Sequence, residues 1–229
     1  MAAEKYPDVK FTAFGGLCLN RPVGGLNPDA VETSLKLGAK VIWLPTNTAE
    51  NHYRKNGKDS STGVVVTRDG KAVDELQDIF ALVKQYNAVL ATGHIGAEEC
   101  FPVVEAARVA GVEKIVITHP EFWVVGMTPE QQADIVRKYD VLLESVYAQP
   151  VNGSYKINIP DNIAAMKAIG PEHFVISTDS GQTVNPYWYE SYTTYFKAVS
   201  EAFTPEQVRK MTHDLSLIHI SEPTRLGMI

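Results

Sequence analysis

Short apolar runs alternate with amphipathic segments along most of this chain. We expect strands over six such runs, Phe11–Asn20, Val41–Pro45, Ala88–His94, Lys114–His119, Val141–Ala148 and Phe174–Asp179. Strands that alternate with helices are typical of βαβ units, in which the strands form one parallel sheet. The pattern therefore predicts a single α/β domain.

Helices are predicted between most of these strands from apolar spacing and from capping residues. We expect them over 27–37, 74–86, 97–110, 128–139, 161–169, 185–202 and 204–212. Asn27 and Thr128 each precede a proline, which is typical of an N-cap followed by the first helical residue. Thr46–Ser61 is expected to be a polar loop and Gly63–Val73 a small hairpin. The aromatic stretch Trp188–Phe196 is expected to pack in the core.

Three of the predicted strands end in residues that suit metal or acid–base chemistry. These residues are His94, in TGHIG, His119, in THPEF, and Asp179, in STDSGQ. The carboxyl ends of parallel strands lie on one side of a sheet, where α/β proteins bind their ligands. Neutral imidazole and carboxylate together suit Zn²⁺ or another first-row divalent ion. The alternatives are a structural histidine at His94 and a turn or helix cap at Asp179.

Composition narrows the class of protein. The net charge of −6 argues against nucleic acid as a partner, because no basic stripe is present to neutralise phosphates. No apolar stretch reaches the roughly 20 residues of a membrane span, and the first residues lack a signal-peptide pattern. Cys18 and Cys100 are far apart, which fits a reducing compartment. We therefore expect a cytoplasmic protein with a small-molecule substrate.

The order of these motifs resembles the amidohydrolase-like superfamily of metal-dependent hydrolases. The strings GGLCLNRPVGGLNP, VIWLPT, ATGHIG, ITHPEF and STDSGQ look most like an uncharacterised cytosolic branch of it. The superfamily fold is a (β/α)₈ barrel, with His on the fifth and sixth strands and Asp on the eighth. By this resemblance, His94, His119 and Asp179 would be ligands of one divalent metal ion. Zn²⁺ is the first expectation and Mn²⁺ the alternative.

The resemblance also implies an activity. Metal-activated water would be used on an amide, ester or lactone bond, or on a phosphoester, with Asp179 accepting the proton of the water. His119 would be a ligand or would polarise the substrate. Two alternatives stay open: a non-catalytic binding protein on a barrel scaffold, and a metal-dependent decarboxylase or lyase of the same superfamily.

The chain departs from the superfamily pattern in two respects. Counting back from Asp179 makes Phe11–Asn20 the third strand, so that about six of eight strands are expected, and no His-x-His pair occurs. The fourth strand offers no Lys, Asp or Glu at its end, which favours a single metal. We therefore expect a fragment of an environmental gene with an open sheet, weak metal binding, impaired activity and homo-oligomers formed through the exposed edges.

Four further residues were assigned with alternatives. Asn20 and Arg21 would face the mouth and bind an anionic substrate, although Arg21 is equally expected in a surface salt bridge. His52 is interpreted as a solvated loop histidine, with a position at the mouth as the alternative. Glu144 is either a mouth carboxylate or a paired interior group.

The last residues differ from the rest of the chain. Leu215–Arg225 reads LSLIHISEPTR, which resembles a translated sequencing adapter. We therefore expect residues 1–214 to form one partial (β/α) barrel domain and residues 215–229 to be a non-native tail. An ordinary C-terminal tail is the alternative.

Overall fold

A six-stranded parallel sheet forms the centre of the molecule, in a computed structural model that describes residues 14–215. Its order is β1-β2-β5-β6-β7-β10, and every pair of neighbours is parallel. The bounds of these strands are β1 Gly16–Cys18, β2 Val41–Trp43, β5 Val89–Ala91, β6 Lys114–Ile117, β7 Leu142–Val146 and β10 Phe174–Ser177. Each lies inside a predicted run, so the α/β class and the sheet are confirmed.

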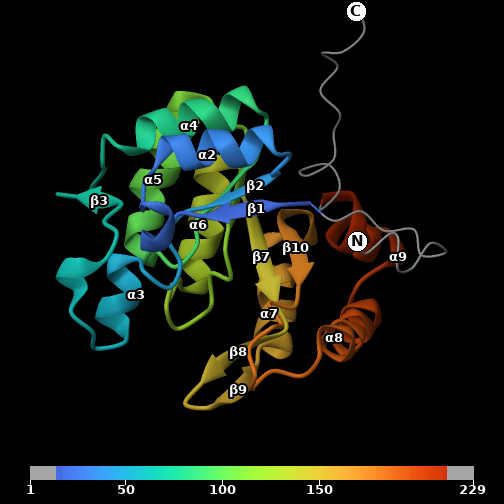
Figure 1. The fold of residues 1–229 in the computed structure, drawn as a ribbon. Coiled ribbons are helices and arrows are strands. Elements are labelled where there is room, and N and C mark those ends of the chain that lie inside the picture. Colours follow the sequence, from blue (N-terminus) through green and yellow to red (C-terminus); the bar gives the residue numbers. More distant parts are fainter. Residues whose placement is uncertain (1–13, 216–229) are drawn as a thin grey trace, which may run out of the picture.

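Helices cover one face of this sheet (Figure 1). Each of these helices contacts the next one in the series α2, α4, α5, α6, α7, α8 and α9. They run over α2 Pro28–Lys36, α3 Glu50–Lys55, α4 Leu76–Gln85, α5 Ala97–Ala110, α6 Pro129–Tyr139, α7 Ile159–Ile169, α8 Trp188–Ala202 and α9 Pro205–Arg209. Asn27 caps α2 and Thr128 caps α6, as their sequence context predicts. Within the described residues, no helix has the length and apolar character needed to cross a bilayer.

The two faces of the sheet differ in burial. Ile42, Leu90, Ile115, Leu143 and Phe174 share the helix-covered face and are almost completely buried. Their neighbours along the strands alternate to the other face, which is less covered, since Trp43, Val116, Glu144 and Val175 on it are only partly buried. The second face is the concave inside of an arc.

The arc does not close among the described residues, because β1 and β10 are the two ends of the sheet. Parallel strands, flanking helices and two free edges are consistent with an incomplete (β/α)₈ barrel, as expected.

Three local predictions were wrong. The segment 46–61 is not only a loop, because it contains α3 and a 3₁₀ turn, Ser60–Thr62. After β7, a hairpin that the sequence did not predict, β8 Ala148–Val151 and β9 Ser154–Ile157, extends beyond the carboxyl end of the strand (Figure 1). Helix α3 has six mostly polar residues, and the hairpin strands have four residues each, so neither element carries a clear apolar period.

The third error concerns the aromatic residues of α8. Trp188 is 66% exposed, Tyr189 51% and Phe196 41%, whereas Tyr195 is fully buried. Only one side of a helix can face a core, and here Tyr195 occupies that side. Most of the aromatic stretch therefore lies at the surface.

Tyr195 attaches α8 to the sheet through a buried polar network. Its hydroxyl lies 2.7 Å from the Ser145 Oγ atom of β7 and accepts a hydrogen bond of 2.8 Å from the Asn162 side chain of α7. Asn162 also donates to the Val146 carbonyl at 2.7 Å. Buried polar groups need such partners, because leaving one unpaired costs about 1–3 kcal/mol.

We expect Tyr195→Phe to lower the free energy of unfolding by roughly 1–3 kcal/mol, because Ser145 and Asn162 each lose a buried partner. Urea unfolding followed by circular dichroism measures this. Tyr189→Phe is the control, since that side chain is half exposed. Equal stability of the two variants would contradict the structural role of the network.

Candidate functional site

Two threonines lock the carboxyl ends of β5 and β6 together. The Thr118 backbone N–H donates to the Thr92 hydroxyl at 3.0 Å, and the Gly93 N–H donates to the Thr118 hydroxyl at 3.0 Å. Both threonines are buried. These bonds continue the pairing beyond the last ladder residues. They therefore fix the relative position of the residues that follow, His94 and His119.

Gly93 allows the chain to turn at the end of β5. Its φ is +63°, and a Cβ atom there would lie 2.5 Å from the Leu44 carbonyl oxygen and 2.7 Å from that of Pro45. The His94 N–H then donates to the same Pro45 carbonyl at 2.9 Å. Only glycine combines this conformation with this close approach. The turn holds His94 against the end of β2.

His94 and His119 lie side by side, as expected from their neighbouring strands. Their ring centroids are 5.0 Å apart with an angle of 50° between the rings. His119 is 3% exposed and stacks on Phe122 at 4.1 Å. Its Nδ1 atom is buried and has no hydrogen-bond partner among the described residues. An unpaired buried nitrogen of this kind is available to a ligand.

Both rings favour the neutral form. Burial lowers the pKa of His94 to about 2, with further lowering by the neighbouring His119 and His52. Burial also lowers the pKa of His119 to about 4. A neutral imidazole has a free lone pair at one nitrogen, which is the state that binds a metal ion or accepts a proton.

His52 is part of this cluster, which corrects its interpretation as a solvated loop histidine. It lies on α3, is partly buried, and stacks on His94 with centroids 4.9 Å apart. The Nδ1 atoms of the two rings are 2.8 Å apart. The sequence signal for the helix that carries His52 is the acidic residue Glu50 in its first turn. Six residues are too few to show a helical apolar period, so the helix was not predicted.

A group of carboxyl side chains lies along β7 and β10. Burial raises the pKa of Glu144 to about 7, and the nearby Asp179 carboxylate raises it further, against the hydrogen bond of Ser177. Burial raises the pKa of Asp179 to about 6, against a hydrogen bond from Gln182. Glu144 is therefore an interior carboxyl group of the arc, beside a second one.

Glu121 adds a third carboxyl group from the loop after β6. Burial raises its pKa to about 8, and its Oε1 atom is buried without a hydrogen-bond partner among the described residues. An uncharged carboxyl group near neutral pH can donate a proton, which an ordinary glutamate cannot.

The convergence of Asp179 with the two histidines stays a prediction. Asp179 has Glu144 and Gln182 as its neighbours, and β7 lies between β6 and β10. Two strand spacings amount to about 10 Å, so the histidines and Asp179 start from separated positions. In residues 14–215, no three His, Cys, Asp or Glu side chains form a group that could hold a metal ion.

Asn20 and Arg21, the predicted substrate-binding residues, differ in their surroundings. The Asn20 side-chain oxygen Oδ1 accepts hydrogen bonds from the Thr46 N–H at 3.0 Å and the Thr48 N–H at 3.1 Å, while the side-chain Nδ2 donates to the Thr46 hydroxyl at 2.7 Å. Asn20 therefore shapes the loop after β2. The Arg21 side chain is exposed and borders a hollow of about 540 Å³.

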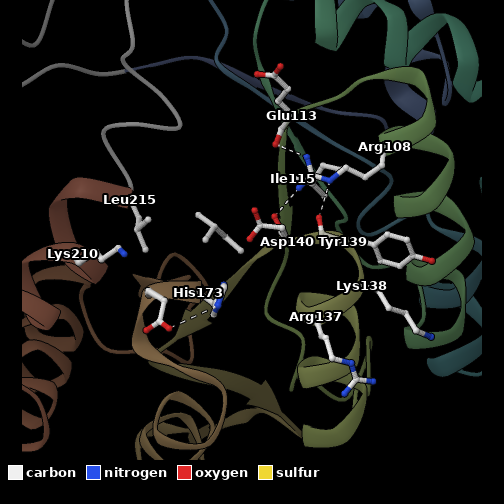
Figure 2. A pocket seen from close by; sticks show the side chains of 12 residues that line it. Arg108, Glu113, Ile115, Arg137, Lys138, Tyr139, Asp140, His173, Lys210 and Leu215 are labelled. Carbon is white, nitrogen blue, oxygen red and sulfur yellow. Dashed lines mark hydrogen bonds and ion pairs between the residues drawn. The ribbon is translucent and has the colours of Figure 1, made fainter.

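Two larger hollows lie elsewhere. Figure 2 shows one of about 680 Å³ at the amino-terminal ends of β6 and β7, where Arg108 donates to the carbonyl oxygens of Val112, Glu113, Tyr139 and Asp140. These bonds tie two helix ends together and assign Arg108 a structural role. The other, of about 860 Å³, flanks the mouth between α3 and the start of α5.

Several solved structures share this fold. An amidohydrolase from Pseudomonas aeruginosa is 12% identical, with a TM-score of 0.57 over 84% of this chain and 67% of that one. A 2,6-dihydroxybenzoate decarboxylase from Rhizobium is 13% identical, with a TM-score of 0.54 over 95% and 73%. A metallo peptidase from Rhodobacter sphaeroides is 11% identical, with a TM-score of 0.56 over 85% and 59%. Such low identities show likeness of fold.

These neighbours are members of the amidohydrolase superfamily, and the resemblance noted in the sequence is confirmed at the level of the fold. A search of curated protein sequences found no match. The profile of a family of unknown function (DUF6282) matches residues 1–144. The chain belongs to that family.

Gly93→Ala tests the turn that positions His94. A Cβ atom would clash with two carbonyl oxygens and force a left-handed conformation, so we expect a loss of roughly 2–4 kcal/mol in the free energy of unfolding. Gly57→Ala is the matched control, because its φ is +65° but nothing lies within 4 Å of its Cβ position. We expect about 1 kcal/mol there. Equal losses in urea unfolding would show that the close approach is unimportant.

Glu144→Gln tests the interior carboxyl group. A folded-state pKa of about 7, above the ordinary 4.5, means that folding stability is lost as pH rises from about 5 to above 7. Glutamine removes that loss, so the variant should gain roughly 2–3 kcal/mol over the native chain at pH 8 and less than about 1 kcal/mol at pH 5. Denaturant midpoints at both values measure this. Glu113→Gln, at an exposed site, is the control and should change the free energy of unfolding by less than about 0.5 kcal/mol.

Proposed function

We propose that this protein is a metal-dependent hydrolase of the amidohydrolase type that acts on a small molecule through an amide, ester or lactone bond. The observation that carries the proposal is the pairing of His94 and His119 at the carboxyl ends of adjacent parallel strands, 5.0 Å apart and with lowered pKa values. Active sites of barrel enzymes are built at that end.

Backbone conformation supports the same site. His119 has a φ of +25° and Asp179 one of +48°, although neither is glycine. Four other Asp or Asn residues, Asp69, Asn87, Asp140 and Asn152, share the φ of Asp179 at turns and helix ends, so the unusual conformation is that of His119. His119 and Asp179 each lie two positions after the last residue of their strands, Ile117 and Ser177, at the carboxyl end of the sheet.

The proposed roles follow the chemistry of each group. His94, His119 and Asp179 would hold one divalent ion, with Zn²⁺ the first expectation and Mn²⁺ the second. Such an ion lowers the pKa of a water molecule towards 7 when bound. Asp179 would accept a proton, for which its pKa of about 6 is suitable. His119 would ligate or polarise the substrate.

Imidazole nitrogen and carboxylate oxygen are suitable ligands for a divalent ion, but His94, His119 and Asp179 do not lie close enough together to share one. The fitting observation is the buried His119 Nδ1 atom without a partner. Asp179 would have to approach the histidines for all three to share one ion. Asn20 would support the substrate through the loop that it shapes, and Arg21 would bind an anionic group of it. Residues 1–214 would form one partial barrel domain, which pairs with a second copy through its sheet edges.

A decarboxylase or lyase is the second candidate. It is favoured by the decarboxylase among the structures that share this fold and by Glu121, whose pKa of about 8 leaves it able to donate a proton near neutral pH. Protonation of a carbanion after loss of CO₂ requires such a donor. The two candidates use the same metal-binding residues and differ in the product.

Metal-dependent turnover tests the proposal. The protein is stripped with a chelator, reloaded with Zn²⁺ or Mn²⁺, and assayed on ester, lactone, amide and aromatic carboxylate panels, with CO₂ measured separately. We expect slow hydrolysis, in keeping with the impaired activity expected from the sequence, that returns with metal and falls at least ~100-fold in Asp179→Asn, because an amide cannot accept the proton.

Asp78→Asn on α4 is the control for this loss, because its side chain is exposed and lies on a helix, not at the end of a strand. Turnover that persists after chelation, or that survives Asp179→Asn, would contradict the proposal. Release of CO₂ without hydrolysis would favour the decarboxylase instead.

A further inference from the structure

Helix α3 is fastened to the end of β5 by a buried asparagine. Asn51 is 1% exposed, and its amide donates to the His94 carbonyl at 2.9 Å and to the Val124 carbonyl at 2.7 Å. Its carbonyl oxygen accepts from Arg54 at 2.9 Å. Since every polar atom of this side chain is engaged, the position of the next residue, His52, is set relative to His94.

The imidazoles of His52 and His94 face each other through the same type of nitrogen. Their Nδ1 atoms are 2.8 Å apart, and their rings are inclined by 17°. Two neutral imidazoles can share one proton at this distance, or both can turn lone pairs to a cation. Tetrahedral bonds of about 2.1 Å to one ion would place the two nitrogens about 3.4 Å apart. The pair would need to open by about 0.6 Å, and the rings would need to turn so that both lone pairs point to the ion.

We propose that His52 and His94 form a two-histidine clamp for a first-row divalent cation, in which both Nδ1 atoms are ligands. This inference rests on the proposed function in one respect, namely that a divalent ion belongs to the site. It adds a ligand from α3 that the resemblance to the superfamily does not supply. The ion would be that of the proposed function, so His119 and Asp179 would be further ligands if they approach it, and water or substrate would complete the coordination.

The surroundings favour a cation of borderline softness. The ligand atoms are imidazole nitrogens, which suit Zn²⁺, Ni²⁺ and Cu²⁺ better than Mg²⁺ or Ca²⁺. Trp123 packs 6.1 Å from the His52 ring, and His119 lies on the other side of His94. The clamp is therefore flanked by aromatic rings, which limit the rotamers of both ligands and prepare their geometry.

The test uses the whole chain and ZnCl₂ as the probe. Titration is followed by calorimetry and by two-bond ¹H–¹⁵N spectra of the histidine rings, which report each ring nitrogen separately. We expect the Nδ1 signals of His52 and His94 to shift together at one equivalent of Zn²⁺. His52→Phe keeps an aromatic ring for stacking, and it should raise the Kd at least about 10-fold.

His173→Phe is the matched control, because this histidine lies beside Glu172 in the hollow at the opposite end of the strands. It should leave Zn²⁺ affinity unchanged. Thermal melts of both variants show that they are folded. The clamp is overturned if His52→Phe binds Zn²⁺ as the native chain does, or if Zn²⁺ leaves the His52 Nδ1 signal in place.

The same measurements separate this inference from the proposed function. If His52→Phe binds as well as the native chain while Asp179→Asn loses both Zn²⁺ and turnover, the clamp fails and the hydrolase proposal stands. If His52→Phe loses Zn²⁺ but no turnover depends on metal in any variant, the clamp stands and the hydrolase proposal fails. If Zn²⁺ does not bind the native chain, the clamp is overturned.

Discussion

Parallel pairing of β5 with β6 is the constraint from which the arrangement of this site follows. The pairing is extended past the ladder by the reciprocal bonds of Thr92 and Thr118, which are buried. Buried hydrogen bonds of this type cannot be exchanged for water without cost. They hold two histidines in adjacent positions, and Gly93 lets the first of them turn against β2. Without this register, His94 and His119 would not lie side by side in the buried environment that keeps both imidazoles neutral.

The histidines and the carboxyl groups of the candidate site lie on different strands of the open sheet. Histidines gather at the ends of β5 and β6, whereas the carboxyl groups of Glu144 and Asp179 gather along β7 and β10. The imidazoles have lowered pKa values and the carboxyl groups have raised ones, and the cause in both cases is mainly burial. Groups with pKa values displaced in opposite directions are typical of sites where protons are transferred.

Most of the fold could be predicted from the sequence because the strands and longer helices carry strong periodic signals. The helix Ala97–Ala110 was predicted with the bounds that the structure gives it, and all six sheet strands fall inside predicted runs. The short elements were missed. Helix α3 and the β8–β9 hairpin are too short for a periodic signal. Because α3 was not predicted, the contact of its His52 with His94 was not predicted either.

The sequence by itself determined the α/β class, the order of the strands along the chain and the placing of His94, His119 and Asp179 after three of them. These features are local, because apolar runs and capping residues act over a few neighbours. Only the tertiary structure decided which of these side chains meet. It joined His52 to His94 across 42 positions, engaged Asn20 in a loop, and set β7 between His119 and Asp179. The physical reason is that sheet order and helix docking depend on packing between distant segments, which a local pattern does not encode.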